Sequence, residues 1–265
     1  MTITAIAIHG AAGRMGKRLV ALASTDSQLK VVAALEHEQH PDLGKDAGLA
    51  CGIMELHVPL AAHLNAKADS LIDFSIPEAA ERILGICVEH KTPLVMATTG
   101  LNERQKEQIS EASVHIPIVW SPSMSLTVNL AMKLVAMAGA ALKDAGGGVD
   151  VEIIERHHRM KEDSPSGTAL KFGEIISGVM GQTMHTHGRE GIVGKRPQHE
   201  IGYHAVRTGD NAGEHTIIFG LLGETLEVSV KASNRDCYAM GALAAAKFVA
   251  KQKPGLYNMY DVLGL

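Results

Sequence analysis

Short apolar runs alternate with amphipathic segments over the first half of the chain. The run ITAIAIHG (residues 3–10) ends in glycine, GRMGKRLVALAST (13–25) has helical periodicity, and LKVVAALE (29–36) is a second apolar run. A strand, a glycine turn, a helix and another strand make a βαβ unit, in which the strands are parallel and the crossover is right-handed. The pattern therefore predicts a parallel sheet that begins near the N-terminus.

The same alternation continues through residue 122. The predicted strands are 70–75, 93–100 and 116–122, and the predicted helices between them are 77–90 and 102–113. Pro77 suits the first turn of its helix, where no intrahelical N–H is required. This succession is typical of a doubly wound nucleotide-binding sheet.

The pattern changes after the SPSM step (121–124). A long Ala- and Met-rich helix, a strand at 151–156 and a helix that begins near Ser166 come next. Three alternating strands then follow, at 200–207, 214–222 and 225–233. Consecutive alternating strands with short turns predict a mixed or antiparallel sheet, and hence a second domain.

The closing segment 238–252 is Ala-rich and helical, and we expect it to pack back on the first domain. The fold class is therefore α/β: an N-terminal Rossmann-type doubly wound parallel sheet plus an α+β C-terminal domain with a mixed or antiparallel sheet. The expected dinucleotide-binding domain is 1–125, completed by 237–265. The expected substrate-binding and oligomerisation domain is 126–236.

Composition narrows the class of protein. The chain of 265 residues has a formal charge of −4, which argues against a broad nucleic-acid surface. Its three cysteines are scattered, which fits a reducing compartment, and the N-terminus lacks a basic signal-peptide region. The longest apolar stretch, 126–142, contains Asn129 and Lys133 and is too short to span a bilayer. We expect a soluble cytoplasmic protein with no membrane partner.

The loop HGAAGRMGKRL contains Gly10, Gly13 and Gly16, a variant of the dinucleotide-binding fingerprint. Gly10 permits a tight turn, Gly13 lets the backbone approach a pyrophosphate, and Gly16 lets the helix pack on the strand. The helix N-terminus then offers N–H groups and a positive dipole end to phosphates. The alternative is a tight turn with no ligand.

The next strand ends in Glu36, whose carboxylate can accept hydrogen bonds from both ribose hydroxyls. A 2′-phosphate would be repelled there unless a cation compensated. His37 is mostly neutral at pH 7, while Arg14 could reach over from the loop. We therefore expect NADH to be used at least as well as NADPH. In the alternative reading Glu36 is only solvated.

Two further segments, ATTG (97–100) and SPSM (121–124), fall at carboxyl ends of predicted strands, where open α/β sheets bind ligands. Their backbone and hydroxyl groups could line a nicotinamide. Alternatively, Thr98 and Thr99 cap the following helix.

The segment ERHHRMKEDSPSGTAL (155–170) has the strongest chemical signal. A histidine such as His157 can transfer a proton near neutral pH, and a lysine such as Lys161 stays charged near bound anions and can donate one. Gly167 and Thr168 would present free N–H groups at a helix N-terminus, which can receive a carboxylate. Such a site suits a small acidic substrate; the alternative is a solvated basic loop ahead of a capped helix.

Two other chemistries find little support. His185 with His187, or His157 with His158, could ligate zinc, yet no HExxH or Cys/His cluster accompanies them, so we expect no metal. A cysteine nucleophile is also unsupported, because none of the cysteines has a credible activated setting.

Several segments in the same order resemble one known family. They are GAAGRMG, DFSIPEA, ATTG, ERHHRMKEDSPSGTAL, GREGIVGKR and IGYHAVRTGDNAGEHTIIF. Together they resemble the 4-hydroxy-tetrahydrodipicolinate reductase (dihydrodipicolinate reductase) family over nearly the whole chain. The resemblance implies NAD(P)H-dependent reduction of 4-hydroxy-tetrahydrodipicolinate to tetrahydrodipicolinate, with loss of water, in lysine and diaminopimelate synthesis. It also implies a homotetramer formed through the second domain's sheet.

The resemblance assigns roles residue by residue. His157 would be the proton donor or acceptor and Lys161 the proton donor. His158 would bind substrate, and the Gly167 and Thr168 amides would hold one of its carboxylates. The implied cofactor-binding residues are Gly10, Ala11, Ala12, Gly13, Arg14, Met15, Glu36, Ala97, Thr98, Thr99, Ser121, Pro122, Ser123 and Met124.

The chain also departs from the family pattern at positions near the cofactor. Ser123 and Thr127 replace an Asn and a Gly, Ile76 stands where some members have a basic residue, and His37 replaces an arginine of members that use either cofactor. These changes concern cofactor selectivity more than the proton donors. Two alternatives remain: a non-catalytic nucleotide-responsive regulator with this fold, and a different Rossmann oxidoreductase.

Overall fold

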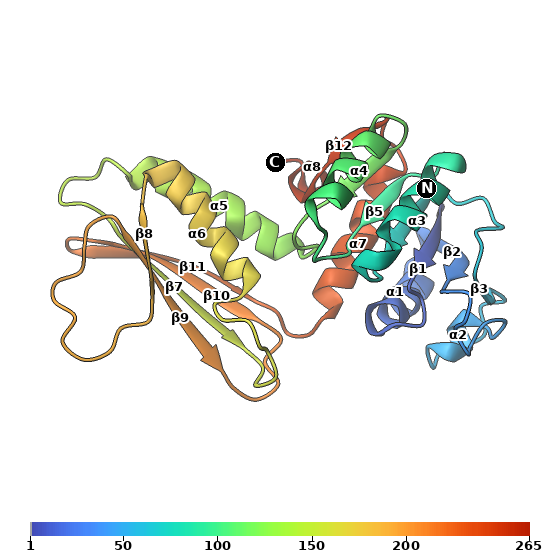
Figure 1. Cartoon of the computed structure of the whole chain (residues 1–265), viewed down its shortest axis with the longest axis horizontal. Helices are drawn as coiled ribbons and strands as arrows, with labels where there is room; N and C mark the ends of the chain where they lie inside the picture. Colours follow the sequence, from blue (N-terminus) through green and yellow to red (C-terminus); the bar gives the residue numbers. More distant parts are fainter. Residues whose placement is uncertain (1) are drawn as a thin grey trace. The chain divides into compact units, whose positions relative to one another are not determined.

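The computed structural model describes residues 2–265, which form two compact units. The first unit comprises the chain up to Leu126 together with Asp236–Leu265, and the second comprises Thr127–Arg235. Figure 1 shows the chain coloured along its sequence, so that the red C-terminal helix can be followed into the unit that contains the blue N-terminal strands.

The first unit contains a seven-stranded sheet in the order β12-β6-β5-β4-β1-β2-β3. All neighbouring strands in it are parallel. The strands are β1 (Thr4–His9), β2 (Leu29–Leu35), β3 (Leu60–Ala61), β4 (Ser70–Asp73), β5 (Leu94–Met96), β6 (Pro117–Trp120) and β12 (Gly255–Tyr257). The predicted doubly wound parallel sheet is confirmed.

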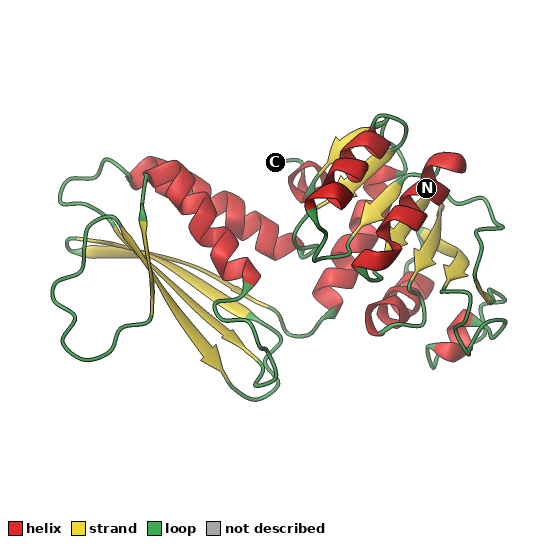
Figure 2. Ribbon diagram, viewed as in Figure 1, coloured by secondary structure: helices red, strands yellow, loops and turns green. Residues whose placement is uncertain are grey.

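Helices cover both faces of this sheet, as Figure 2 shows in red around the yellow strands. They are α1 (Arg14–Thr25), α2 (Ala47–Ala50), the 3₁₀ helix η1 (Pro77–Ala79), α3 (Ala80–Glu89), α4 (Glu103–Ser113), α7 (Asp236–Val249) and α8 (Met259–Leu263). Asn102 begins α4 through a capping box with Gln105. The side chain that caps this helix is therefore Asn102, and the alternative in which Thr98 or Thr99 caps it is wrong.

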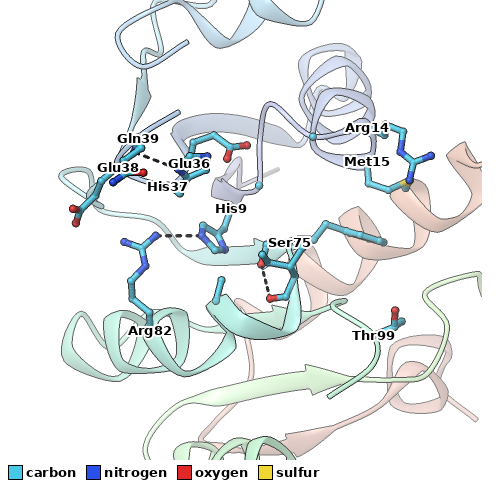
Figure 3. A pocket seen from close by; sticks show the side chains of 15 residues that line it. His9, Arg14, Met15, Glu36, His37, Glu38, Gln39, Ser75, Arg82 and Thr99 are labelled. Carbon is cyan, nitrogen blue, oxygen red and sulfur yellow. Dashed lines mark hydrogen bonds between the residues drawn. The ribbon is translucent and has the colours of Figure 1, made fainter. Parts of the chain in front are cut away.

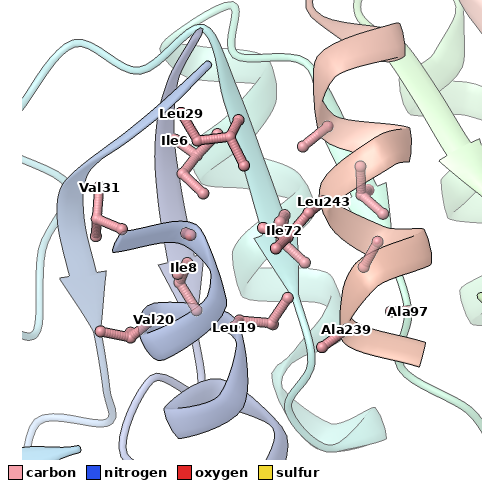
Figure 4. Close-up of a cluster of buried hydrophobic side chains, with 14 of the residues drawn as sticks. Ile6, Ile8, Leu19, Val20, Leu29, Val31, Ile72, Ala97, Ala239 and Leu243 are labelled. Atoms are coloured by element: carbon pink, nitrogen blue, oxygen red, sulfur yellow. The ribbon is translucent and has the colours of Figure 1, made fainter. Parts of the chain in front are cut away.

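The hydrophobic core of the first unit lies on the two faces of the sheet. Ile6, Ile8 and Ile72 pack with α1 and α7 on one face (Figure 4). Ala7 and Leu71, one residue away along the same strands, join α3 and α4 on the other face, because successive strand side chains point to opposite sides. Each fully buried Ile or Leu stabilises the fold by about 1.5–3 kcal/mol. The closing helix thus belongs to the core of the first unit.

The second unit contains a five-stranded mixed sheet in the order β11-β10-β7-β9-β8. The strands are β7 (Asp150–His157), β8 (Met184–His187), β9 (Glu200–Arg207), β10 (Glu214–Leu221) and β11 (Glu224–Lys231). β9 pairs parallel with β7 and β8, while β10 pairs antiparallel with β7 and β11. The mixed sheet is as predicted, but β9 and β10, which are consecutive in sequence, are separated by β7.

β7 is the middle strand of this sheet, and its side chains are correspondingly buried. Val151, Ile153, Glu155 and His157 alternate as buried residues along it, whereas the edge strands β8 and β11 are mostly exposed. Two helices belong to this part of the chain, α5 (Leu126–Leu142) and α6 (Gly167–Met180). Phe172 and Ile176 of α6 are fully buried. No helix within residues 2–265 is both long and apolar enough to cross a membrane.

Candidate active site

The glycine loop joins β1 to α1 in the first unit. Gly10 has φ +75°, a conformation that L side chains rarely adopt, and Gly13 is the N-cap residue of α1. A Cβ atom added to Gly16 would lie 2.0 Å from the carbonyl oxygen of Gly10. Since that neighbour is backbone, only glycine allows α1 to lie this close to the loop.

Glu36 follows β2 and is attached to the same loop. Its Oε1 accepts a hydrogen bond from the Ala12 N–H at 2.7 Å, and the residue is only 8% exposed. Each carboxylate oxygen can accept two hydrogen bonds, so this contact orients Glu36 and leaves capacity for ribose hydroxyls. The structure therefore brings the predicted ribose acceptor to the predicted pyrophosphate loop.

A cavity of about 840 Å³ opens beside the loop (Figure 3). Of the predicted cofactor-binding residues, Gly10, Gly13, Arg14, Met15, Glu36 and Thr99 line it. The other lining residues are His9, His37, Glu38, Gln39, Phe74, Ser75, Ile76, Ala79 and Arg82. The cavity is large enough for a nucleotide, since ligand pockets usually span roughly 300–1,000 Å³.

Several predicted cofactor residues have side chains occupied elsewhere in the first unit. The Thr98 hydroxyl donates to Asp73 Oδ2 at 2.7 Å and accepts from the Ser75 N–H. The Ser121 hydroxyl accepts from the Met259 N–H at 2.9 Å, which ties the end of β6 to α8. Ala97 and Met124 are buried. These contacts use part of the hydrogen-bonding capacity of Thr98 and Ser121, so we expect the backbone atoms at these positions to make most of the polar contacts with a cofactor.

A buried polar network that no sequence motif predicted lies at the carboxyl ends of β1, β4 and β5. Asp73 is fully buried, and His9 Nδ1 lies 2.6 Å from its Oδ1. Ser75 and Thr98 donate their hydroxyls to the same carboxylate. The register explains the contact, because His9 and Asp73 are paired across β1 and β4.

In the second unit, His157 ends β7 and is held by two charged residues. Its Nδ1 lies 2.6 Å from Glu155 Oε2, and Arg207 donates two hydrogen bonds to the Glu155 carboxylate at 2.7 and 2.8 Å. The Ser166 N–H donates to Glu155 Oε1 as well. Glu155 has only 1% exposure, so its charge is compensated inside the protein.

These contacts define the protonation state of His157. Burial lowers its pKa below the usual value of a histidine, although Glu155 opposes this effect. Burial alone would raise the pKa of Glu155, but the hydrogen bonds from Arg207 and His157 outweigh it and lower that pKa. A carboxylate only accepts hydrogen bonds, so the neutral ring has its proton on Nδ1 and Nε2 is the basic atom.

Lys161 lies beside the start of α6. Its Nζ is 2.7 Å from Asp163 Oδ1, and this contact, with a further one from the Gly167 N–H, lowers the pKa of the Asp163 carboxyl. Ser166 begins the helix by accepting from the Ala169 N–H. A carboxylate of the chain itself thus rests on Lys161 and Gly167, two of the groups predicted to act on a substrate dicarboxylate.

Two further histidines are neighbours of His157: His158 follows it in the sequence, and His215 lies beside it in space. His158 is half-buried in the segment that follows β7. The His215 ring, on β10, lies 5.3 Å from that of His157 between ring centroids and contacts Phe172. Burial lowers the pKa of His215 to about 4, so it is neutral at pH 7. No motif in the sequence points to this neighbour, because the contact depends on the pairing of β10 with β7.

His185 and His187, one of the two possible zinc-binding pairs, both stack on Tyr203, and His185 Nδ1 lies 2.9 Å from the Tyr203 hydroxyl. Residues 2–265 contain no group of three or more His, Cys, Asp or Glu side chains placed to hold a metal ion. Burial raises the pKa of all three cysteine thiols, Cys51, Cys87 and Cys237, which disfavours the nucleophilic thiolate.

A parallel sheet with a glycine loop, an acid at the end of the second strand and an adjoining nucleotide-sized cavity define a Rossmann-type oxidoreductase that uses a pyridine nucleotide. Residues 4–124 match the family described as dihydrodipicolinate reductase, N-terminus, and residues 127–263 match dihydrodipicolinate reductase, C-terminus. The chain belongs to the dihydrodipicolinate reductase family, as its sequence motifs predicted.

Individual relatives agree with this assignment. The chain is 55% identical to a 4-hydroxy-tetrahydrodipicolinate reductase of Rhodopirellula baltica, covering 98% of this chain and 96% of the relative. It is 43% identical to a protein of the same name from Syntrophotalea carbinolica, with 98% of each covered.

Solved structures give the same fold. A dipicolinate-bound dihydrodipicolinate reductase from Paenisporosarcina sp. TG-14 superposes with a TM-score of 0.79 at 25% identity, covering 98% of this chain and 99% of the other. An amine dehydrogenase from Mycobacterium smegmatis superposes with a TM-score of 0.65 at 12% identity, covering 98% and 95%. The second likeness concerns the fold alone.

Proposed function

We propose that this protein reduces 4-hydroxy-tetrahydrodipicolinate to tetrahydrodipicolinate with NADH or NADPH, in the synthesis of diaminopimelate and lysine. The net reaction consumes one reduced nicotinamide and one proton and releases water. The membership of the family, together with relatives named for this activity, carries the proposal. The dipicolinate bound to the Paenisporosarcina enzyme is a cyclic dicarboxylate of the same kind.

The cofactor would be held by the first unit. The glycine loop and the N-terminus of α1 would receive the pyrophosphate, and Glu36 the adenosine ribose. Backbone atoms at Ala97, Thr98, Thr99 and at Ser121, Pro122, Ser123, Met124 would face the nicotinamide, which supplies the hydride when bound. Because Glu36 disfavours a 2′-phosphate, we expect NADH to be at least as good a cofactor as NADPH.

The substrate would be held by the second unit. One carboxylate would bind at the start of α6, to the amides of Gly167 and Thr168, and would displace Asp163 from Lys161. His158, which is half-buried in the segment after β7, would also bind the substrate. His157, through Nε2, and Lys161, through Nζ, would exchange protons with the heterocycle as charge develops on it.

The assembly and location follow the family resemblance. We propose a homotetramer formed through the sheet of the second unit, in the cytoplasm. Ile153 is buried on one face of that sheet. On the opposite face, Ile154 is 39% exposed and Val206 is 41% exposed. Light scattering on the purified protein tests this part, and a monomer would contradict it.

The reductase activity is tested by mixing the purified protein with enzymatically generated 4-hydroxy-tetrahydrodipicolinate and following NADH absorbance. Oxidation that requires both the substrate and the protein is expected. Absence of oxidation with either cofactor would end the assignment.

The role of Lys161 is tested by Lys161→Ala. Loss of a positioned proton donor should lower kcat by about 10²–10⁴-fold while the dissociation constant of NADH stays the same. Lys171→Ala removes a lysine of α6 that pairs with Glu174 at the surface, and it serves as the matched control. Weakened NADH binding in Lys161→Ala would contradict the role.

A further inference from the structure

The cavity beside the glycine loop contains a further cation, Arg82, that bears on the choice between NADH and NADPH. Arg82, on α3, lines the cavity together with Glu36, His37 and Glu38. Its guanidinium points toward His9, as Figure 3 shows, with an NH2 group 3.4 Å from His9 Nε2. Its other terminal nitrogen donates to the Ala62 carbonyl oxygen, also at 3.4 Å.

His9 is itself fixed by the buried network. It is 3% exposed, and its Nδ1 lies 2.6 Å from Asp73 Oδ1. Asp73 in turn is fixed by the hydroxyls of Ser75 and Thr98. Since the carboxylate accepts the Nδ1 proton, Nε2 of the neutral ring is an acceptor, and Arg82 is a permanent donor. The direction of each contact from Asp73 to Arg82 is therefore consistent.

This arrangement puts the guanidinium beside the ribose end of the cavity. The Glu36 N–H donates to the Ala61 carbonyl oxygen at 2.9 Å, and Arg82 binds the next carbonyl along, that of Ala62. The same backbone segment thus contacts both Glu36, the proposed acceptor of ribose hydroxyls, and Arg82. Glu36 and Glu38 bring negative charge to this end, and Arg82 opposes them.

NADPH differs from NADH only in the 2′-phosphate, a dianionic group at this ribose. A guanidinium recognises phosphate through parallel N–H···O bonds and always keeps its charge. We propose that Arg82, oriented by His9 and Asp73, receives the 2′-phosphate of NADPH, so that this chain uses NADPH as well as NADH despite Glu36. The inference rests on the proposed function, because it takes the cavity to be the cofactor site.

Binding measurements test this inference without turnover. Calorimetry would give dissociation constants for NADH, NADPH, 5′-ADP and 2′,5′-ADP with the wild type, Arg82→Gln, Arg82→Lys and Arg104→Gln. Arg82→Gln should weaken NADPH and 2′,5′-ADP by about tenfold or more and NADH by less than about twofold. Arg82→Lys should lie between, because lysine keeps the charge without the planar fork. Arg104, an exposed arginine on α4 paired with Glu81, provides the control.

A second variant tests the orienting role of His9. His9→Asn retains a donor for Asp73 but is too short to reach Arg82, so it should weaken NADPH selectively and by less than Arg82→Gln. In the double variant the two effects should not add, because both act through one guanidinium. Unchanged NADH binding would show that each variant is folded.

Three outcomes would overturn the inference. Equal losses for NADH and NADPH in Arg82→Gln would mean that Arg82 contacts a part common to both cofactors. An unchanged NADPH affinity would remove Arg82 from the site. A wild-type NADPH affinity more than about a hundredfold below that of NADH would show that the 2′-phosphate is not accepted. Failure of the proposed function would give a different result: NADH and NADPH would bind as expected, yet the substrate would oxidise neither of them.

Discussion

At the scale of single residues, the environment of His157 determines what its ring can do. Glu155 fixes the ring by Nδ1, and Arg207 keeps Glu155 ionised in a site with almost no solvent. This leaves Nε2 as the atom that exchanges protons. Gly213 lies against it: an added Cβ would be 3.0 Å from Nε2. Glu155 and Arg207 are thus positioning residues.

Glu155→Gln tests this relation. An amide can donate to Nδ1 and so favour the wrong tautomer, and we expect kcat to fall by about a hundredfold with NADH affinity unchanged. Because Glu155 raises the pKa of His157, its removal should also move the pH–rate limb of His157 to lower pH. Glu174→Gln, at the surface of α6, is the control. A limb that stays in place would refute the positioning role.

How much of the candidate site the sequence predicts depends on separation along the chain. His157, Lys161, Gly167 and Thr168 lie in one short segment, so residue types and spacing sufficed to name them. Arg207 contacts a residue 52 positions away, and His9 one 64 positions away. Those contacts exist only because β7 pairs with β9 and β1 with β4. Which strands pair, and in which register, cannot be read from the spacing of residue types along one sequence.

At the scale of elements, close packing of small residues places α7 in the first unit. An added Cβ at Gly241 would lie 1.7 Å from the Met124 carbonyl oxygen, a backbone atom that cannot move aside. Gly85, in the exposed part of α3, has no atom within 4 Å of the corresponding position. Close packing therefore requires glycine at position 241, whereas there is room for a side chain at position 85.

Gly241→Ala and Gly85→Ala make a matched pair. Gly241→Ala should destabilise the fold by about 1–3 kcal/mol or more, because the helix must shift. Gly85→Ala should stabilise it by about 0.5–1 kcal/mol, because alanine is the better helix former. Urea denaturation followed by circular dichroism measures both, and equal effects would contradict the packing argument.

The elements that the sequence predicted are the long periodic ones. The first two strands, α1, α4 and β9 have ends within about two residues of the expected ones. β3, β12, α2 and α8 were missed because two to five residues are too few to show a period. β8, with the sequence MHTH, was missed because it is a polar edge strand without alternation.

At the scale of the molecule, stability should depend on pH through His215. Its folded pKa of about 4 lies below the ordinary value, so the unfolded chain binds more protons between pH 4 and 6.5. The stability is complete above pH 6.5 and is lost as the pH falls toward 4, by about 3 kcal/mol in total. His157 and Lys161, which face this ring, oppose its protonation, while Glu155 favours it.

His215→Leu tests this dependence. The variant keeps an apolar contact with Phe172 and should lose less stability between about pH 7 and about pH 4.5 than the wild type, by roughly 2.5 kcal/mol. Unfolding free energies from urea titrations at the two pH values give the comparison. The pH dependence of the unfolding free energy that remains in the variant would come from His157 and from carboxylates. Identical pH profiles for variant and wild type would rule out His215 as the source.

The return of the chain to the first unit has a consequence for synthesis. One face of that sheet is covered by α1 and α7. Ala242, Leu243 and Ala246 of α7 are almost wholly buried there. A ribosome makes those residues only after Thr127–Arg235. On the nascent chain, Ile and Val side chains of the first strands therefore stay exposed and prone to aggregation until residues 236–265 have been made. A premature stop codon near residue 235 would release a polypeptide whose earliest portion had never had its partner helix.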